Sequence, residues 1–196
     1  MILGRGWLAR NLGLPALNHG VRVPRWSAKE HAPFPTRTEE YWFVANALER
    51  TRRGFVVDAG TGFNPEIHLL AYILGNMLYD VYAVDQHPAG MAMPYHPRVQ
   101  RALGDIQHLS LDDRVADIWV CVSTLEHLEP TARAETAGEA FRVLNHGGFA
   151  IVTMDNTEPE RLTGLMSEAG FQVGSVVPLQ GEPLTPPVGW IVAQKP

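Results

Sequence analysis

An acid and two glycines follow an apolar run early in the chain, and their spacing is typical of a ligand-binding turn. The segment Asp58-Ala59-Gly60-Thr61-Gly62 comes directly after Phe55-Val56-Val57. Glycines at this spacing permit a tight turn and let a bound molecule approach the backbone closely. Because one Gly-x-Gly turn also closes many strands that bind nothing, the hypothesis of a binding site needs further residues in matching positions.

Two further acids occupy such positions. Asp85 follows the apolar run at residues 81–84, and Gly104-Asp105-Ile106 follows the run at residues 99–103. A carboxylate at the first position can accept two hydrogen bonds from the vicinal hydroxyls of a ribose. At the second position, Asp105 offers an acceptor for the exocyclic amine of adenine, and Ile106 offers an apolar surface for its ring. These residues predict a site for a cofactor that contains adenosine.

The elements that must position these residues alternate between strands and helices. Strands are expected at residues 55–57, 81–84, 99–103, 117–122 and 149–154. Strands separated by helices of this length predict a mostly parallel α/β sheet with right-handed crossovers and with helices on both faces. In such a sheet the ligand crevice lies beyond the carboxyl ends of the strands, which is where the acids and glycines fall.

Caps and apolar spacing predict three helices. The first spans residues 38–50 with Thr38 as N-cap, the second starts at Asn64 and Pro65, and the third runs from Pro130 to Gly147-Gly148. The inward-facing residues of the second helix are expected to be Ile67, Leu70, Ala71 and Leu74, and those of the third Ala134, Ala137, Phe141 and Leu144.

Two segments depart from this alternation. Residues 86–98 contain three prolines and a glycine, so we expect a loop there in place of a helix. Residues 171–177 and 189–193 flank a proline-rich loop and predict an antiparallel hairpin at the end of the sheet.

In their order along the chain, these motifs resemble those of the class I S-adenosylmethionine-dependent methyltransferase family. The glycine turn at residues 58–62, Asp85 and Asp105 match, as do Ser123-Thr124-Leu125-Glu126-His127-Leu128 and the segment at residues 142–148. The ordered set is far more specific than any one motif. The resemblance covers roughly residues 38–195 and implies a Rossmann-like fold. We therefore expect an irregular basic arm or cap at residues 1–36 and a cofactor-binding domain at residues 37–196.

The resemblance also implies roles for individual residues. Gly60 and Gly62 would hold the methionine portion of S-adenosylmethionine, Asp58 would help to bind its ammonium group, and Ser123 would lie beside the sulfonium. The full set of expected cofactor-binding residues is Asp58, Ala59, Gly60, Thr61, Gly62, Asp85, Gln86, Gly104, Asp105, Ile106 and Ser123.

Methyl transfer from a sulfonium requires mainly alignment, with a base only where the acceptor must lose a proton. His127 is the candidate base, although it and Glu126 could equally shape the loop. Met154-Asp155-Asn156 is similar to half of the magnesium site of catechol-type O-methyltransferases, but Ser123 stands where the partner acid is expected. We therefore predict no metal site.

The acceptor is expected to be a small molecule, because Ser123-Thr124-Leu125-Glu126-His127 resembles the branch that acts on metabolites, sugars and lipid-like compounds. The Asp/Asn-Pro-Pro-Tyr/Phe motif of DNA amino-methyltransferases and the Pro-Cys pair of cytosine C5 enzymes are absent. We expect the acceptor to be bounded by residues 1–43, 86–98 and 155–160, with aromatic candidates at Trp26, Tyr41, Trp42 and Tyr95, which could instead pack the cap onto the sheet.

Two other classes of function remain open. The first is a methyltransferase-like binding or accessory domain without activity, because cofactor binding and catalysis use different residues. The second, a nicotinamide-dependent oxidoreductase, would share Asp85 but would need a third glycine where Pro65 stands, and it leaves Gly104-Asp105 unexplained.

Composition is consistent with one compact domain. The chain has 196 residues, of which 45% are hydrophobic, and its net charge is −5. We expect a soluble cytoplasmic protein, because no apolar run is long enough to span a membrane and the chain has a single cysteine. This residue, Cys121, lies in an apolar run, so we expect it to be buried in the core. The acidic body also argues against a broad nucleic-acid groove, although residues 1–29 carry five basic residues and no acid.

Overall fold

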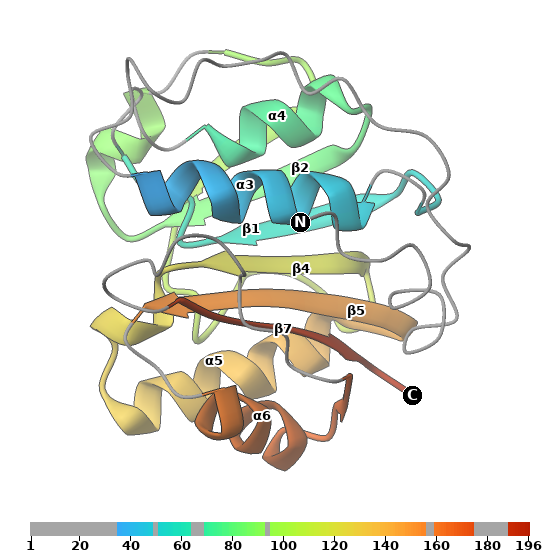
Figure 1. Cartoon of the computed structure of the whole chain (residues 1–196). Coiled ribbons are helices and arrows are strands. Elements are labelled where there is room, and N and C mark those ends of the chain that lie inside the picture. Colours follow the sequence, from blue (N-terminus) through green and yellow to red (C-terminus); the bar gives the residue numbers. More distant parts are fainter. Residues whose placement is uncertain (1–34, 49–50, 64–68, 93–94, 156–158, 175–187) are drawn as a thin grey trace.

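A seven-stranded sheet forms the centre of the molecule in a computed structural model, which describes residues 35–48, 51–63, 69–92, 95–155, 159–174 and 188–196. The strand order is β3-β2-β1-β4-β5-β7-β6. Helices cover both faces of the sheet, with α3 and α4 on one side and α5 and α6 on the other (Figure 1). The strands are β1 (Phe55–Ala59), β2 (Asp80–Asp85), β3 (Val99–Leu103), β4 (Ala116–Val122), β5 (Leu144–Asp155), β6 (Gln172–Val173) and β7 (Val188–Gln194).

Among the described residues, one α-helix precedes the first strand and the others connect successive strands. The helices are α3 (Pro35–Leu48), α4 (Leu70–Asn76), α5 (Pro130–Val143) and α6 (Pro159–Glu168), with 3-10 turns η1 (Pro88–Ala92) and η2 (Leu125–His127). None of the helices in the described part of the chain is long and apolar enough to cross a membrane.

The sheet has one hydrophobic core on each face, which explains why the sequences of the central strands are continuous apolar runs. In β4, Ile118 and Val120 pack against α3 and α4, whereas Trp119 and Cys121 belong to the core under α5 and α6. Successive side chains of a strand point to opposite faces, so a strand buried on both faces has no polar alternation. Cys121 is fully buried, as predicted, and burial raises the pKa of its thiol far above the usual range.

The register brings the carboxyl ends of β1 to β4 to one edge of the sheet. Ala59 pairs with Val84, and Asp85 pairs with Leu103, all in parallel. The backbone beyond the strands continues this alignment, because the Gly60 N–H donates to the Val84 carbonyl at 2.9 Å and the Gly104 N–H to the Asp85 carbonyl at 3.0 Å. The residues that follow three different strands therefore converge.

The predicted α/β sheet and its antiparallel end are confirmed. β1 to β5 are parallel, β7 is antiparallel to both β5 and β6, and β7 lies between these two strands. The predicted loop at residues 86–98 contains the 3-10 turn η1 and, within its described residues, no α-helix. Residues 1–34, the predicted helix start at residues 64–65 and the hairpin segment at residues 175–177 lie outside the described residues.

Some predicted helix boundaries were wrong. α5 ends at Val143, before Gly147-Gly148, because Leu144 has extended backbone angles and already pairs with Ala116 in the sheet. Ala134 is exposed, since every residue from 130 to 135 is exposed or half-buried and the buried face begins at Thr136. α3 begins at Pro35, so Thr38 lies within it and does not cap it.

Candidate cofactor site

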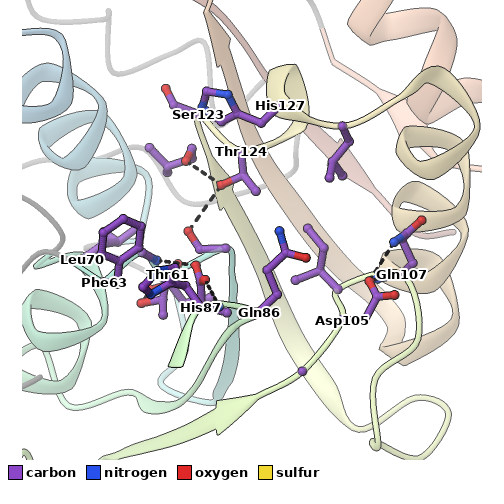
Figure 2. A pocket seen from close by; sticks show the side chains of 18 of the residues that line it. Thr61, Phe63, Leu70, Gln86, His87, Asp105, Gln107, Ser123, Thr124 and His127 are labelled. Atoms are coloured by element: carbon purple, nitrogen blue, oxygen red, sulfur yellow. Dashed lines mark hydrogen bonds between the residues drawn. The ribbon is translucent and has the colours of Figure 1, made fainter. Parts of the chain in front are cut away.

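A cavity of about 570 Å³ opens where the carboxyl ends of β1 to β4 converge. Figure 2 shows that its walls come from different loops, with Ser123, Thr124 and His127 together on one side and Asp105 and Gln107 on another. The lining residues are Tyr41, Asp58, Gly60, Thr61, Gly62, Phe63, Leu70, Asp85, Gln86, His87, Gly104, Asp105, Ile106, Gln107, Val122, Ser123, Thr124, His127 and Leu128.

Glycine is required at position 60 for two reasons. Gly60 has a φ of 74°, in the left-handed region, and a Cβ there would overlap the side chain of Thr124. The Thr124 hydroxyl also lies within hydrogen-bonding distance of the carbonyls of Gly60, at 3.3 Å, and Val122, at 3.0 Å (Figure 2). The turn after β1 and the loop after β4 are therefore packed directly against each other.

The carboxylate of Asp85 ties the glycine turn to the end of β2. Its Oδ2 accepts from the Gly62 N–H at 2.9 Å, and its Oδ1 accepts from the His87 N–H at 2.8 Å. Each carboxylate oxygen has a second lone pair, so both remain able to accept from a diol. His87 itself stacks on Phe63, with ring centroids 4.1 Å apart, and both rings line the cavity.

Asp58 is a buried acid at the floor of the cavity, only 2% exposed. Burial raises its pKa from 3.8 to about 6, against the opposing effects of the Thr61 hydroxyl, which donates at 2.8 Å, and of the Arg101 charge. A cationic ligand group nearby would favour its charged form and lower this pKa again. The residue is therefore suited to an ammonium group.

The loop after β3 presents one polar and one apolar group. Asp105 Oδ1 accepts from the backbone N–H of Gln107 at 2.9 Å and from its side-chain amide at 2.8 Å. The backbone bond is the main cause that lowers the pKa of Asp105, so this acid is charged at neutral pH. Ile106 is anchored in the core beside Leu109 while it lines the cavity.

Arg142 and Glu139 of α5 hold this same loop in place. Glu139 Oε1 accepts from the Leu109 N–H at 2.6 Å and from Arg142, and Arg142 reaches Asp113 at 2.6 Å. Arg142 also donates to the carbonyl of Leu109 at 3.3 Å, so it holds the segment that follows Ile106 at two points. This is a structural role for the arginine of the segment at residues 142–148.

Ser123 closes the wall after β4 in an unusual conformation. Its φ of 42° is in the left-handed region, which is unfavourable for a residue with a side chain. Hydrogen bonds hold it there: its N–H donates to Thr153 Oγ1 at 3.0 Å, and its hydroxyl donates to Glu40 Oε1 at 2.6 Å. His127, in η2, is exposed and lines the cavity on the same side (Figure 2).

The structure brings together all but one of the residues predicted to bind the cofactor. The exception is Ala59, which is fully buried in β1 and does not line the cavity. Among the aromatic candidates, Tyr41 lines the cavity, whereas Tyr95 is 86% exposed and does not. Trp26 lies outside the described residues, as does the side chain of Trp42.

Several lining residues were missed from the sequence. Phe63, His87, Gln107 and Thr124 each follow a predicted site residue directly, so extending each motif by one residue would have included them. Leu70 and Val122 were interpreted only as apolar positions of a helix and a strand, and Leu128 only as the end of the motif at residues 123–128. Glu40, whose carboxylate accepts from Ser123, was not predicted as a site residue, although it shares a helix face with the buried residues Phe43, Val44 and Ala47.

A metal cluster is not found among the residues with described side chains, where no three His, Cys, Asp or Glu residues come together. Asn156 and the side chain of Asp155, the magnesium-like half site, lie outside those described.

The comparisons with known proteins agree with this geometry. A family model described as a methyltransferase domain matches residues 57–152. A "probable S-adenosylmethionine-dependent methyltransferase" of Mycolicibacterium smegmatis is 28% identical over 160 residues, which cover 69% of this chain and 61% of the relative. The chain thus spans about three fifths of the length of this curated relative.

Solved methyltransferases share the fold at low sequence identity. The TehB-like S-adenosylmethionine-dependent methyltransferase of Corynebacterium glutamicum has a TM-score of 0.68 at 16% identity, covering 89% of this chain and 95% of that one. The 1,6-didemethyltoxoflavin-N1-methyltransferase of Burkholderia thailandensis, solved with S-adenosylhomocysteine, has a TM-score of 0.67 at 19% identity, covering 87% and 81%.

The sheet order, the strand-end cavity and the structural neighbours define a Rossmann-like domain of the class I methyltransferase type. The family model places a match to a methyltransferase domain over residues 57–152, on the part of the chain that builds the cavity.

Proposed function

We propose that this protein transfers the methyl group of S-adenosylmethionine to a small-molecule acceptor by in-line displacement. The observation that carries the proposal is the convergence on one cavity of the glycine turn after β1, the acid after β2, the acid and apolar residue after β3, and Ser123 after β4. Each of these groups suits a different part of the cofactor.

The adenosine half of the cofactor would occupy the side of β2 and β3. Ile106 supplies an apolar surface for the adenine ring, and the carboxylate of Asp105 accepts from its exocyclic amine. Gly104 keeps the backbone close to the ring, while Asp85 and Gln86 accept from the ribose hydroxyls. The fit is supported by the lone pairs that Asp85 keeps after it has accepted from Gly62 and His87.

The methionine half would lie against the glycine turn. Gly60, Thr61 and Gly62 expose backbone there, and Asp58 supplies a buried negative charge for the ammonium group. This layout directs the sulfonium toward the wall after β4, where Ser123 and His127 lie on one side of the cavity (Figure 2).

When bound, S-adenosylmethionine supplies a methyl group already activated by the positive sulfur. The protein therefore contributes mainly alignment and exclusion of water, since holding two reactants in line is worth several kcal/mol. His127 is exposed at this wall and would accept the proton of an acceptor that has one to lose.

A small-molecule acceptor is supported by analogy with the structural neighbours. Structural neighbours include the toxoflavin-precursor N1-methyltransferase and a glycopeptide N-methyltransferase, MtfA, whose names describe compounds of this kind.

Binding and turnover test the proposal separately. Thermal unfolding with S-adenosylmethionine, S-adenosylhomocysteine or NAD should show stabilisation by the two sulfur ligands only, about 2.7 kcal/mol for a ligand at 100 times its Kd. No shift with either sulfur ligand would refute the cofactor assignment.

Product formation over a panel of hydroxyl, amine and carboxyl acceptors then tests catalysis. His127→Ala should lower turnover for acceptors that must lose a proton and leave cofactor affinity unchanged. Tight cofactor binding without product from any acceptor would favour an accessory binding domain.

A further inference from the structure

An arginine of α5 is bound to the loop that carries His127. Arg133 Nε donates to the carbonyl of Leu128 at 2.8 Å, and its Nη2 donates to the carbonyl of Glu126 at 3.2 Å. These two residues stand on either side of His127 in the chain. One guanidinium group therefore holds the backbone both before and after the candidate base.

The loop depends on such support at this point. The turn η2 is closed by two backbone hydrogen bonds, from the His127 N–H to the Thr124 carbonyl at 3.1 Å and from the Leu128 N–H to the Leu125 carbonyl at 3.0 Å. Its first residue, Leu125, is anchored in the core, whereas His127 is exposed. A turn of three residues leaves its last carbonyls without partners inside the turn, and Arg133 supplies the donors for two carbonyls at this end.

Arg133 departs from a local rule of helix sequences. It is the fourth residue of α5, which begins at Pro130, and a positive charge in the first turn opposes the helix dipole. Its own N–H continues the helical pattern by donating to the Glu129 carbonyl at 3.0 Å. A residue that goes against the local preference and makes specific hydrogen bonds outside its helix marks a position with a further use.

The direction of the His127 ring depends on the backbone that carries it. Within the part of the chain that the structure describes, no hydrogen bond to the imidazole fixes its orientation. Figure 2 shows His127 beside Ser123 at the wall after β4. Leu128, whose carbonyl accepts from Arg133, lines the same cavity.

We propose that Arg133 is a positioning residue for His127, because it fixes the backbone on both sides of it and so directs the imidazole at the methyl acceptor. The inference rests on the proposed function and on the role of His127 as base in it. In that step the acceptor forms a bond to the methyl carbon, the electron pair of the C–S bond stays on sulfur, and His127 takes the proton. Arg133 exchanges no proton or electron, but a misplacement of about 1 Å in the base can slow such a step roughly a hundredfold.

The alternative is that Arg133 only stabilises the start of α5 and the loop. A double-variant cycle separates the two roles. Arg133→Met removes both hydrogen bonds and should lower kcat by about tenfold to a hundredfold for acceptors that must lose a proton. The Kd for S-adenosylhomocysteine should change less than about twofold. The variant with both His127→Ala and Arg133→Met should be no slower than His127→Ala alone, because Arg133 acts through His127.

Two further variants sharpen this comparison. Arg133→Lys keeps the charge but lacks the planar fork that reaches two carbonyls, so it should restore only part of the lost kcat. Arg52→Met is the matched control, because Arg52 is exposed ahead of β1 and lies at the opposite edge of the sheet from the cavity. It should change neither kcat nor the Kd.

Hydrogen exchange measures the hold on the loop without any acceptor. The amides of His127 and Leu128 close η2, so they should exchange about tenfold faster or more in Arg133→Met than in wild type. The amides of β4 should exchange at the wild-type rate in both Arg133 variants and in Arg52→Met.

Additive losses in the double variant would overturn the inference, and so would equal losses for acceptors with and without a proton to lose. Unchanged exchange at His127 and Leu128 in Arg133→Met would overturn it too. If His127→Ala left turnover unchanged, the inference would fail while the cofactor assignment stood. If wild type formed no product from any acceptor, the proposed function itself would fail, whereas faster exchange in Arg133→Met would still support the hold of Arg133 on the loop.

Discussion

Replacing Gly60 by alanine tests the close packing between the turn after β1 and the loop after β4. Gly60 has a φ of 74°, and a Cβ there would lie 2.8 Å from the Cβ of Thr124 and overlap the rest of that side chain. Gly147 is a matched control, because it has a φ of 77° and a Cβ there would meet nothing within 4 Å. The two substitutions therefore share the backbone strain and differ in the steric contact.

The structure gives a magnitude for each variant. A left-handed conformation costs an alanine roughly 1–2 kcal/mol, and this is the whole expected loss for Gly147→Ala. Gly60→Ala adds overpacking of about 1–3 kcal/mol, for a total of about 2–5 kcal/mol. In a protein of this size 1 kcal/mol lowers Tm by about 2–4 °C, so the two melting temperatures should differ by several degrees.

Thermal unfolding and cofactor titration measure the two consequences of the substitution. Gly60→Ala should also weaken binding of S-adenosylmethionine, because Gly60 lines the cavity, whereas Gly147→Ala should leave the Kd unchanged. Equal Tm values for the two variants would refute the described contact between Gly60 and Thr124. An unchanged Kd in Gly60→Ala would show that the turn does not touch the cofactor.

Three further substitutions probe charged side chains. Asp85→Asn should weaken cofactor binding by about tenfold, measured by calorimetry, because hydrogen bonds to a charged partner contribute about 1.5–3 kcal/mol. Asp58 has its pKa raised by burial to about 6, so the folded state binds the proton more tightly than the unfolded state does, and stability falls as pH rises from about 4 to 6. Asp58→Asn should therefore gain stability relative to wild type over this range in pH-dependent unfolding of the cofactor-free protein, and a constant difference would contradict the raised pKa. Lys195→Met should lose about 1–3 kcal/mol in denaturant unfolding, since the ammonium donates to the carbonyls of Phe141 at 2.7 Å and Leu144 at 2.8 Å at the end of α5; no loss would show that water replaces these bonds.

The sheet could be predicted because its signals are local. β3 has the predicted bounds, Val99–Leu103, although it is an edge strand with no buried residue, because turn residues flank it on both sides. The cavity followed from a general rule, because residues after parallel strands meet at one edge. Asp85 and Asp105 could therefore be assigned to one site although they are far from Asp58 in sequence.

Other features depended on contacts between distant segments. The end of α5 was misplaced because Gly147-Gly148 gives a strong local stop signal, while the actual end is set by pairing of Leu144 with Ala116 across the sheet. Glu40 was missed for the same reason. Its partners, Ser123 and Thr153, lie more than 80 residues away, and an acid near a helix start usually interacts with the helix dipole.

The bonds of Asp85 have a kinetic consequence. Because its carboxylate already joins the Gly62 and His87 amides, two loops of the site are fixed relative to each other before a cofactor arrives. Binding to this part then needs no ordering of backbone, so association should proceed in one step at a rate set by diffusion and orientation. Differences in affinity among adenosine-containing ligands should accordingly appear in how long each one stays bound.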